Sequence, residues 1–203
     1  PNGVNGFVTN NSWGNGTNGN AYDSLAAQYD GFVRDASAAG TIDPLVIVFS
    51  AGNQGASGLT RPKVAKNLIS VAASENVRTE LSPAADHDNL QDIADFSSRG
   101  LAADGRVKPD ITAPGAGVTG GRSGTDSLFG NIDAHHRWSE GTSHAAPNVA
   151  GAAALFVNFW KNGHAGVNPS PALVKAALIN STTDMTGALA GGARPNGFEG
   201  WGL

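Results

Sequence analysis

An uninterrupted apolar run, Leu45-Val46-Ile47-Val48-Phe49, constrains the fold of this chain most strongly. Five β-branched, aliphatic and aromatic residues without polar alternation are typical of a strand that is covered on both faces in a parallel sheet. The run ends at Ser50-Ala51-Gly52-Asn53, which are residues that favour a turn. The sequence therefore predicts a buried strand that delivers a polar turn at its carboxyl end.

Three further segments have strand character. The segment 6–13 begins with apolar residues and leads into 15–20, which is almost entirely turn residues. The run 68–73 follows a loop with Gly and Pro, and 107–112 is a shorter strand-like piece. Apart from that piece, we expect the region 74–139 to form mostly surface loops, because it is weakly periodic and rich in Gly, Asp and Ser.

Three segments have helical character. Apolar residues recur at helical spacing between a cap at Asn20 and a stop at Gly40. The segment 151–160 is Ala-rich and apolar on all sides, so we expect a helix buried in the middle of the molecule. Ser170-Pro171 provides a cap and a first-turn proline for a last helix. Alternating strands and helices predict a layered α/β domain with a mainly parallel sheet.

Composition excludes several functions. The 203 residues fit one domain, and 40% hydrophobic residues suffice for a core. The net charge is -4 and the 13 Lys and Arg are scattered, which argues against nucleic acid or an anionic membrane as a partner. The longest apolar stretch, 150–160, is too short and too interrupted to span a bilayer. Without cysteine there is no disulfide framework, thiol catalysis or Cys-ligated zinc.

Ser143 is the candidate nucleophile. It lies in Gly141-Thr142-Ser143-His144-Ala145-Ala146-Pro147, where the Ala-rich helix begins. A helix N-terminus offers unpaired backbone N–H groups and the positive end of the helix dipole, which suit an oxyanion that develops on an attacked carbonyl. From this segment alone, an ordinary Ser/Thr helix cap is the alternative.

Five blocks in order resemble the subtilases, the subtilisin-like serine proteases. Gly141–Gly151 resembles the family's nucleophile block, and Ser50–Gly55 its oxyanion block. Two blocks between them (96–100 and 108–115) and one at the end of the chain (200–202) are similar as well. The resemblance covers nearly the whole chain. It implies a subtilisin-like three-layer α/β/α fold, with residues 1–203 as the C-terminal portion of one catalytic domain whose sheet is incomplete on its N-terminal side.

The resemblance also implies roles for single residues. Ser143 would attack the peptide carbonyl, and Asn53 would donate its side-chain amide to the oxyanion. Ser12-Trp13-Gly14 would pair with the substrate backbone, and Ala51-Gly52 would form the other wall of the pocket for the residue before the cut. Gln54 would lie near this pocket, where a neutral amide would give no charge preference. Arg61-Pro62 lies where the family often has a proline, which can be cis.

The triad is incomplete in this sequence. The family order is Asp, His, Ser, and no Asp or His precedes Ser12. His144 is a poor base for its own neighbour, because adjacent residues at a helix start point to different faces. We therefore expect a complementary N-terminal segment or chain to supply the Asp and His. The chain opens at Pro1 without an initiator Met, which suggests a processed or partial product, and the chain alone is expected to be inactive.

Alternatives remain open at this point. A non-catalytic subtilase-like module could bind extended peptides or a partner along Ser12-Trp13-Gly14. The G-x-G-x-x-G match at 115–120 is a poor dinucleotide motif, because no helical pattern follows it. Asp133, His135 and His136 favour a solvated loop over a metal site. The resemblance implies an extracellular enzyme that acts on a polypeptide substrate and needs no cofactor for its chemistry. Structural calcium, which is common in the family, is a further expectation from the resemblance.

Overall fold

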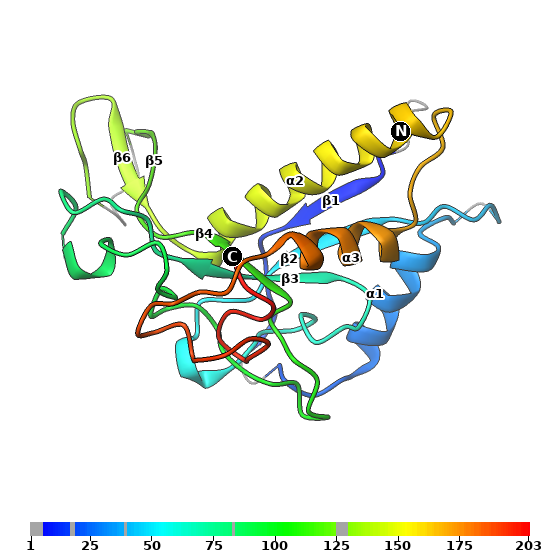
Figure 1. The fold of residues 1–203 in the computed structure, drawn as a ribbon, viewed down its shortest axis with the longest axis horizontal. Coiled ribbons are helices and arrows are strands. Elements are labelled where there is room, and N and C mark those ends of the chain that lie inside the picture. Colours follow the sequence, from blue (N-terminus) through cyan, green and yellow to red (C-terminus); the bar gives the residue numbers. More distant parts are fainter. Residues whose placement is uncertain (1–5, 17–18, 39, 83, 125–129) are drawn as a thin grey trace.

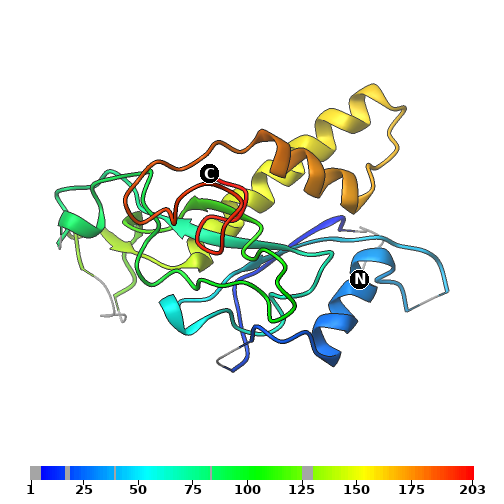
Figure 2. The same cartoon turned by 60° about the horizontal axis from the view of Figure 1, so that its bottom comes forward.

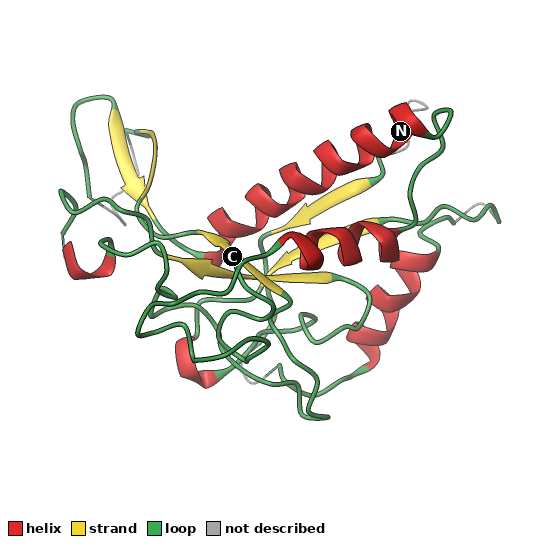
Figure 3. Cartoon of the chain, in the orientation of Figure 1, coloured by secondary structure: helices red, strands yellow, loops and turns green. Residues whose placement is uncertain are grey.

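Parallel strands and three helices form the framework of the computed structural model, which describes residues 6–16, 19–38, 40–82, 84–124 and 130–203. Figure 1 shows the elements in space and Figure 3 shows how much of the chain is loop. The strands are β1 (Val8–Asn11), β2 (Val46–Ser50), β3 (Ile69–Ser74), β4 (Ile111–Pro114), β5 (Val118–Gly121) and β6 (His136–Ser139); the helices are α1 (Ser24–Arg34), α2 (Thr142–Gly163) and α3 (Pro171–Ser181), with short 3-10 turns at Gly55–Ser57 and Ala84–Asp86.

The main sheet has the order β1-β2-β3-β4, and each neighbouring pair is parallel. The predicted buried strand is β2, whose five residues are all buried. The strands expected in 6–13, 68–73 and 107–112 correspond to β1, β3 and β4. The antiparallel pair β5–β6 was missed, because neither its Val-Thr-Gly-Gly nor its His-Arg-Trp-Ser sequence forms an apolar run.

Helices cover both faces of the sheet, which confirms the layered α/β architecture. Val46 and Val48 of β2 pack with residues of α2 and α3, whereas Ile47 and Phe49 pack with residues of α1. Successive residues of a strand point to opposite faces, so the apolar run serves two cores at once. Figure 2 shows α2 and α3 on one side of the strands and α1 on the other.

The first helix begins later and ends earlier than predicted. Asp23, not Asn20, is its cap, and the Asp23 carboxylate accepts a hydrogen bond from Ala26 N at 2.9 Å. Asn20 instead accepts a hydrogen bond from Leu59 N at 2.9 Å and holds a loop beside the candidate site. A side chain suited to capping was thus used in a long-range contact that local sequence does not reveal.

The second helix is longer than predicted and is not buried all round. Ala145, Val149, Ala153 and Val157 are buried in the core that includes β2, β3 and β4. Leu155 and Phe159, however, are 73% and 74% exposed. Among the described residues no element covers this side of α2, although its composition is that of a buried helix.

The region 74–139 is less superficial than predicted. Ile93, Ala94, Ser97 and Ser98 are all buried, so part of this region lies inside the molecule. Polar and small residues conceal this burial in the sequence, because their hydrogen bonds rather than an apolar pattern hold them inside.

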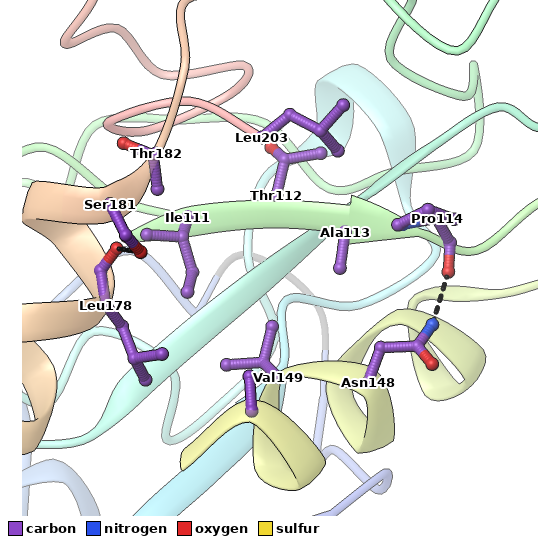
Figure 4. Close-up of a pocket in the computed structure, with 11 residues that line it drawn as sticks. Ile111, Thr112, Ala113, Pro114, Asn148, Val149, Leu178, Ser181, Thr182 and Leu203 are labelled. Atoms are coloured by element: carbon purple, nitrogen blue, oxygen red, sulfur yellow. Dashed lines mark hydrogen bonds between the residues drawn. The ribbon is translucent and has the colours of Figure 1, made fainter. Parts of the chain in front are cut away.

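The third helix matches its prediction. Ser170 caps α3 by accepting a hydrogen bond from Leu173 N at 3.1 Å, and Pro171 occupies the first turn. A cavity of about 240 Å³ lies between α3, α2 and β4. In Figure 4 the amide of Asn148 donates to the carbonyl oxygen of Pro114 at 3.1 Å beside it. None of the predicted site residues lines this cavity.

The described part of the chain holds no helix with the length and hydropathy required to cross a bilayer.

Candidate active site

Three segments far apart in the sequence meet at one end of the sheet (Figure 1). They are the residues after β1, the residues after β2 and the first turn of α2. Carboxyl ends of parallel strands share one edge, where open α/β sheets usually place their sites. Together these segments border a cavity of about 230 Å³, which is lined by Ser12, Trp13, Gly14, Gly16, Ser50, Gly52, Asn53, Gln54, Thr60, Lys63, Thr142 and Ser143.

Ser143 is the second residue of α2. Its hydroxyl donates to the carbonyl oxygen of Ser12 at 3.3 Å, and the Ser12 hydroxyl donates to the carbonyl oxygen of Ser143 at 3.1 Å. First-turn N–H groups have no partner within their own helix, so the backbone N–H of Ser143 points out of the helix end. The helix is preceded by Gly141, whose φ of +148° is a conformation that L side chains rarely adopt.

Asn53 and Thr142 form a fixed pair at this helix end. The Oδ1 atom of Asn53 accepts hydrogen bonds from Thr142 N at 2.9 Å and from Thr142 Oγ1 at 2.8 Å. Because a backbone N–H can only donate, the atom facing it must be the carbonyl oxygen of the amide. The Nδ2 group of Asn53 is therefore turned to the other side, past Gly141, and a Cβ on Gly141 would lie 3.2 Å from it.

The Thr142 hydroxyl also accepts a hydrogen bond from Gly52 N at 3.1 Å. One buried hydroxyl thus connects the pocket wall after β2 with the amide of Asn53. Ser98 supports the same turn, since its Oγ accepts from Gln54 N at 3.0 Å and its N–H donates to Gly52 O at 2.9 Å. The block 96–100 therefore fixes the geometry of the turn after β2.

The histidines lie away from the hydroxyl of Ser143. All five histidines of the chain are within the described residues, and none of them has a hydrogen bond to Ser143. The ring of His144 interacts through Nε2 with the hydroxyl of Ser139, and burial lowers the pKa of His144. This agrees with the prediction that His144 is not the base for Ser143.

The other four histidines have their own neighbours. His87 is buried and lies 4.0 Å from the Glu140 carboxylate. His136 pairs with Asp133 at 2.8 Å on the exposed surface, and His164 contacts the carbonyl oxygen of Trp160 at 2.8 Å. His135 is exposed. Within the described ranges, no group of three or more His, Asp or Glu side chains is placed to hold a metal ion.

The predicted substrate-binding residues are largely brought together. Ser12, Trp13, Gly14, Gly52 and Gln54 all line the cavity beside Ser143. Ala51 is fully buried and is not among the lining residues, so it lies behind the wall rather than on it. The Arg61–Pro62 peptide bond beside this pocket is cis. The G-x-G-x-x-G segment at 115–120 overlaps strand β5 and does not open a helix, as its context predicted.

Five residues that line the cavity were not predicted as site residues: Gly16, Ser50, Thr60, Lys63 and Thr142. Thr60 and Lys63 are buried and line the cavity. A weak signal for Lys63 existed, because it is a cation directly followed by apolar Val64-Ala65 in a segment that leads into a buried strand. Sequence alone, however, does not show that this segment turns toward the serine.

A serine at the start of a central helix, next to an asparagine amide of fixed orientation in an α/β fold, is an arrangement that occurs in serine hydrolases. The model of the subtilase family matches residues 4–202 of this chain. The chain therefore belongs to the subtilase family of serine proteases.

Relatives support this assignment. Pyrolysin of Pyrococcus furiosus is 32% identical over 160 residues, covering 70% of this chain and 11% of pyrolysin. Serine protease AprX of Bacillus subtilis is 33% identical over 147 residues, covering 68% of this chain and 30% of AprX. The structure of the prenylagaramide maturation protease PagA has a TM-score of 0.58 at 25% identity, covering 90% of this chain and 53% of PagA. The chain thus spans only part of the length of the proteins it matches.

Proposed function

We propose that residues 1–203 form the C-terminal, serine-bearing portion of one subtilisin-like catalytic domain that cleaves peptide bonds. Ser143 Oγ attacks the carbonyl carbon of the scissile bond, and its proton passes to a base and then to the leaving amine. The C–N bond breaks to leave an acyl-enzyme, which water hydrolyses to free the serine. The observation that carries this proposal is the bonding of Asn53 Oδ1 to Thr142, which leaves Nδ2 free to donate. A Cβ placed on Gly141 would lie 3.2 Å from Asn53 Nδ2 and 3.6 Å from Ser143 N, so both groups border the same point.

The oxyanion would be held by two donors, Asn53 Nδ2 and the backbone N–H of Ser143. Both belong to rigid parts of the fold, since one is fixed by Thr142 and the other by α2. Donors that are oriented before the reaction stabilise a developing charge without reorganisation cost. The described histidines are engaged elsewhere or exposed, so we assign the base and its orienting Asp to a polypeptide segment outside these 203 residues.

The surface of the chain suits such a segment. Within the described sheet, β1 pairs only with β2, so its other edge has unpaired backbone groups. Helix α2 lies beside β1 (Figure 1). Its exposed Leu155 and Phe159 provide apolar area that a further segment could cover. A complementary N-terminal segment of the same catalytic domain would add strands to β1 and cover α2, and it would bring the His and Asp to Ser143.

Substrate would bind as an extended strand along Ser12-Trp13-Gly14, which places its scissile carbonyl between Asn53 and Ser143. Gly52 and Gln54 would form the opposite wall. We place the enzyme outside the cell, on the strength of the family resemblance. Structural calcium stays a prediction, which the melting temperature of the complete protein with and without a chelator would test.

A non-catalytic peptide-binding module is the second candidate. The observation that favours it is the hydroxyl of Ser143, which donates to the carbonyl of Ser12 and has no histidine partner among the described residues. A fluorophosphonate separates the two functions, because it reacts with a serine that a base activates.

The experiment is intact-mass analysis of the complete protein before and after treatment with the fluorophosphonate. We expect one adduct on Ser143, no adduct in Ser143→Ala, and an unchanged adduct in Ser57→Ala, which changes an exposed serine of the loop beside the site. Absence of any adduct in the complete protein would contradict catalysis and favour the binding module. A separate polypeptide that supplies the base would appear in the same spectrum.

A further inference from the structure

A buried lysine lines the active-site cavity. Lys63 is 1% exposed and lines the cavity together with Ser143 and Asn53. Its ammonium donates to the hydroxyl of Thr60 and lies 6.0 Å from the ring centroid of Phe49. Among the described residues no carboxylate forms an ion pair with it. Lysine is almost never fully buried without a partner, so this arrangement calls for an explanation.

The other buried lysine of the chain shows what is missing. Lys108 is also 1% exposed, and it pairs with Asp110 at 2.6 Å. The buried ammonium of Lys108 thus has a carboxylate as its partner, and it contributes to the packing of the fold. Lys63 receives only a neutral hydroxyl and the face of an aromatic ring, which compensate a charge less well than a carboxylate.

The two walls of the substrate pocket converge on this ammonium. A Cβ added to Gly14 would collide with Lys63 Nζ and with Thr60 Oγ1, so the ammonium lies directly against the Gly14 backbone. On the opposite wall, a Cβ added to Gly52 would lie 2.9 Å from Thr60 Oγ1. A side chain that enters between these two glycines therefore meets Thr60 and Lys63 at its tip.

We propose that Lys63 makes this pocket selective for an acidic residue, Asp or Glu, immediately before the cleaved bond of the substrate. The inference rests on the proposed function, because the pocket is defined by its position beside Ser143. The substrate carboxylate would supply the counter-charge that the fold withholds from Lys63. The neutral amide of Gln54 predicts no charge preference. That prediction rests on Gln54 alone and does not include Lys63, which lines the same pocket.

The protonation state of Lys63 permits this pairing. Burial lowers the pKa of Lys63 to about 8, which leaves the ammonium mostly protonated at neutral pH. A bound carboxylate supplies a counter-charge and favours the charged form of the lysine, whereas a bound neutral side chain such as Gln can accept a hydrogen bond but supplies no counter-charge. The Glu and Gln side chains therefore differ in the charge that they place beside the buried ammonium.

The test compares binding in the complete protein with Ser143→Ala, where hydrolysis cannot occur. The probes are two fluorescein-labelled peptides, Ala-Ala-Pro-Glu-Ala-Ala and its Gln counterpart, followed by fluorescence anisotropy. We expect the Glu peptide to bind at least about tenfold more tightly than the Gln peptide. Adding Lys63→Met should abolish this ratio, and adding Lys66→Met should leave it unchanged, because Lys66 is exposed and three residues away.

Equal affinity for the two peptides in the Ser143→Ala protein would overturn the proposal, even if Lys63→Met does not fold. A preference for Glu that survives in a folded Lys63→Met protein would overturn it as well. The fluorophosphonate experiment reports on catalysis separately. A labelled serine without Glu preference refutes the role of Lys63 alone, whereas Glu preference without a labelled serine refutes catalysis and leaves an acid-selective binding site.

Discussion

At the scale of single residues, the amide of Asn53 is oriented by two bonds from Thr142, through its backbone N–H and its hydroxyl. The side chain of Asn53 is itself exposed at the site, so nothing else in the described contacts fixes which way its amide points. Oxyanion stabilisation depends on donors that are aimed before the charge develops. Both residues of this pair should therefore matter for turnover, in different degrees.

Removing the donor itself should have the larger effect. In the complete enzyme we expect Asn53→Ala to lower kcat by about 10²–10³ with little change in KM, the scale known for an asparagine donor in subtilisin. Steady-state kinetics on a peptide anilide would measure it. Gln54→Ala, which changes the neighbouring pocket residue, serves as the control and should alter KM more than kcat. An unchanged kcat in Asn53→Ala would remove the assigned role.

Removing the positioning hydroxyl should have a smaller effect of the same kind. Thr142→Val keeps the shape and the backbone N–H but loses the bonds of Thr142 Oγ1 to Asn53 and from Gly52. We expect kcat to fall by about tenfold, since one charge-positioning hydrogen bond contributes on the order of 1 kcal/mol. Thr142→Ser should restore kcat. If Thr142 has a purely structural role, Thr142→Val should instead lower the melting temperature and leave kcat of the folded enzyme unchanged.

The pH dependence of selectivity should report on Lys63. The groups recorded around its ammonium, Thr60 and Phe49, do not titrate near neutral pH. With a pKa of about 8, Lys63 is charged below this pH and neutral above it. The ratio of kcat/KM for Glu and Gln substrates should therefore fall as pH rises through about 8. Because both substrates share the triad, a ratio that stays constant from pH 6 to 10 would contradict this.

At the scale of secondary-structure elements, Asp110 connects three of them. Its carboxylate accepts from Ser70 N in β3 at 2.7 Å and pairs with Lys108 at 2.6 Å and with Lys175 of α3 at 2.8 Å. Burial by itself raises the pKa of Asp110, but the ammonium groups of Lys108 and Lys175 outweigh it and hold the pKa below its usual range. The block 108–115 thus stabilises the packing of β3 and β4 against α3.

Asp110→Ala should be strongly destabilising, because it removes the buried carboxylate that pairs with the ammonium groups of Lys108 and Lys175. We expect a loss of about 3–5 kcal/mol in the free energy of unfolding, measured by urea denaturation of the complete protein. Asp104→Ala removes an exposed pair with Arg106 and should cause little change. Because the folded-state pKa of Asp110 is depressed, its contribution is present above about pH 4 and lost as pH falls further. Equal stability of both variants would contradict the assignment.

The exposed side of α2 should become protected in the complete protein. Hydrogen exchange at the backbone of α2, and at β1, should be slower in the complete protein than in residues 1–203 alone. The double variant Leu155→Glu/Phe159→Glu should lower the yield of fluorophosphonate-labelled enzyme, whereas Ile42→Glu, at a loop position that is 80% exposed, should not. Normal labelling of the double variant would show that this face does not hold the segment that supplies the base.

At the scale of the whole molecule, much of the fold was predictable, because the apolar run in β2 and the helical spacing in α1 are local signals. The family's blocks located Ser143 and Asn53 for the same reason. The roles of Thr142, Thr60 and Lys63 were not predictable. They arise where the starts and ends of distant elements converge, and no periodicity in the sequence encodes which side chains share a cavity.

The hydroxyl of Thr142 touches both Gly52 on the pocket wall and the amide of Asn53. For protein engineering this shared atom is a constraint. Substitutions that widen or reshape the wall at Gly52 will also shift the donor, so a library that selects only for new substrate preference will lose turnover along the way. The side chains of Thr60 and Lys63 hydrogen-bond to each other and not to Thr142 or Asn53. Substitutions at these two residues could therefore change the substrate preference without lowering kcat.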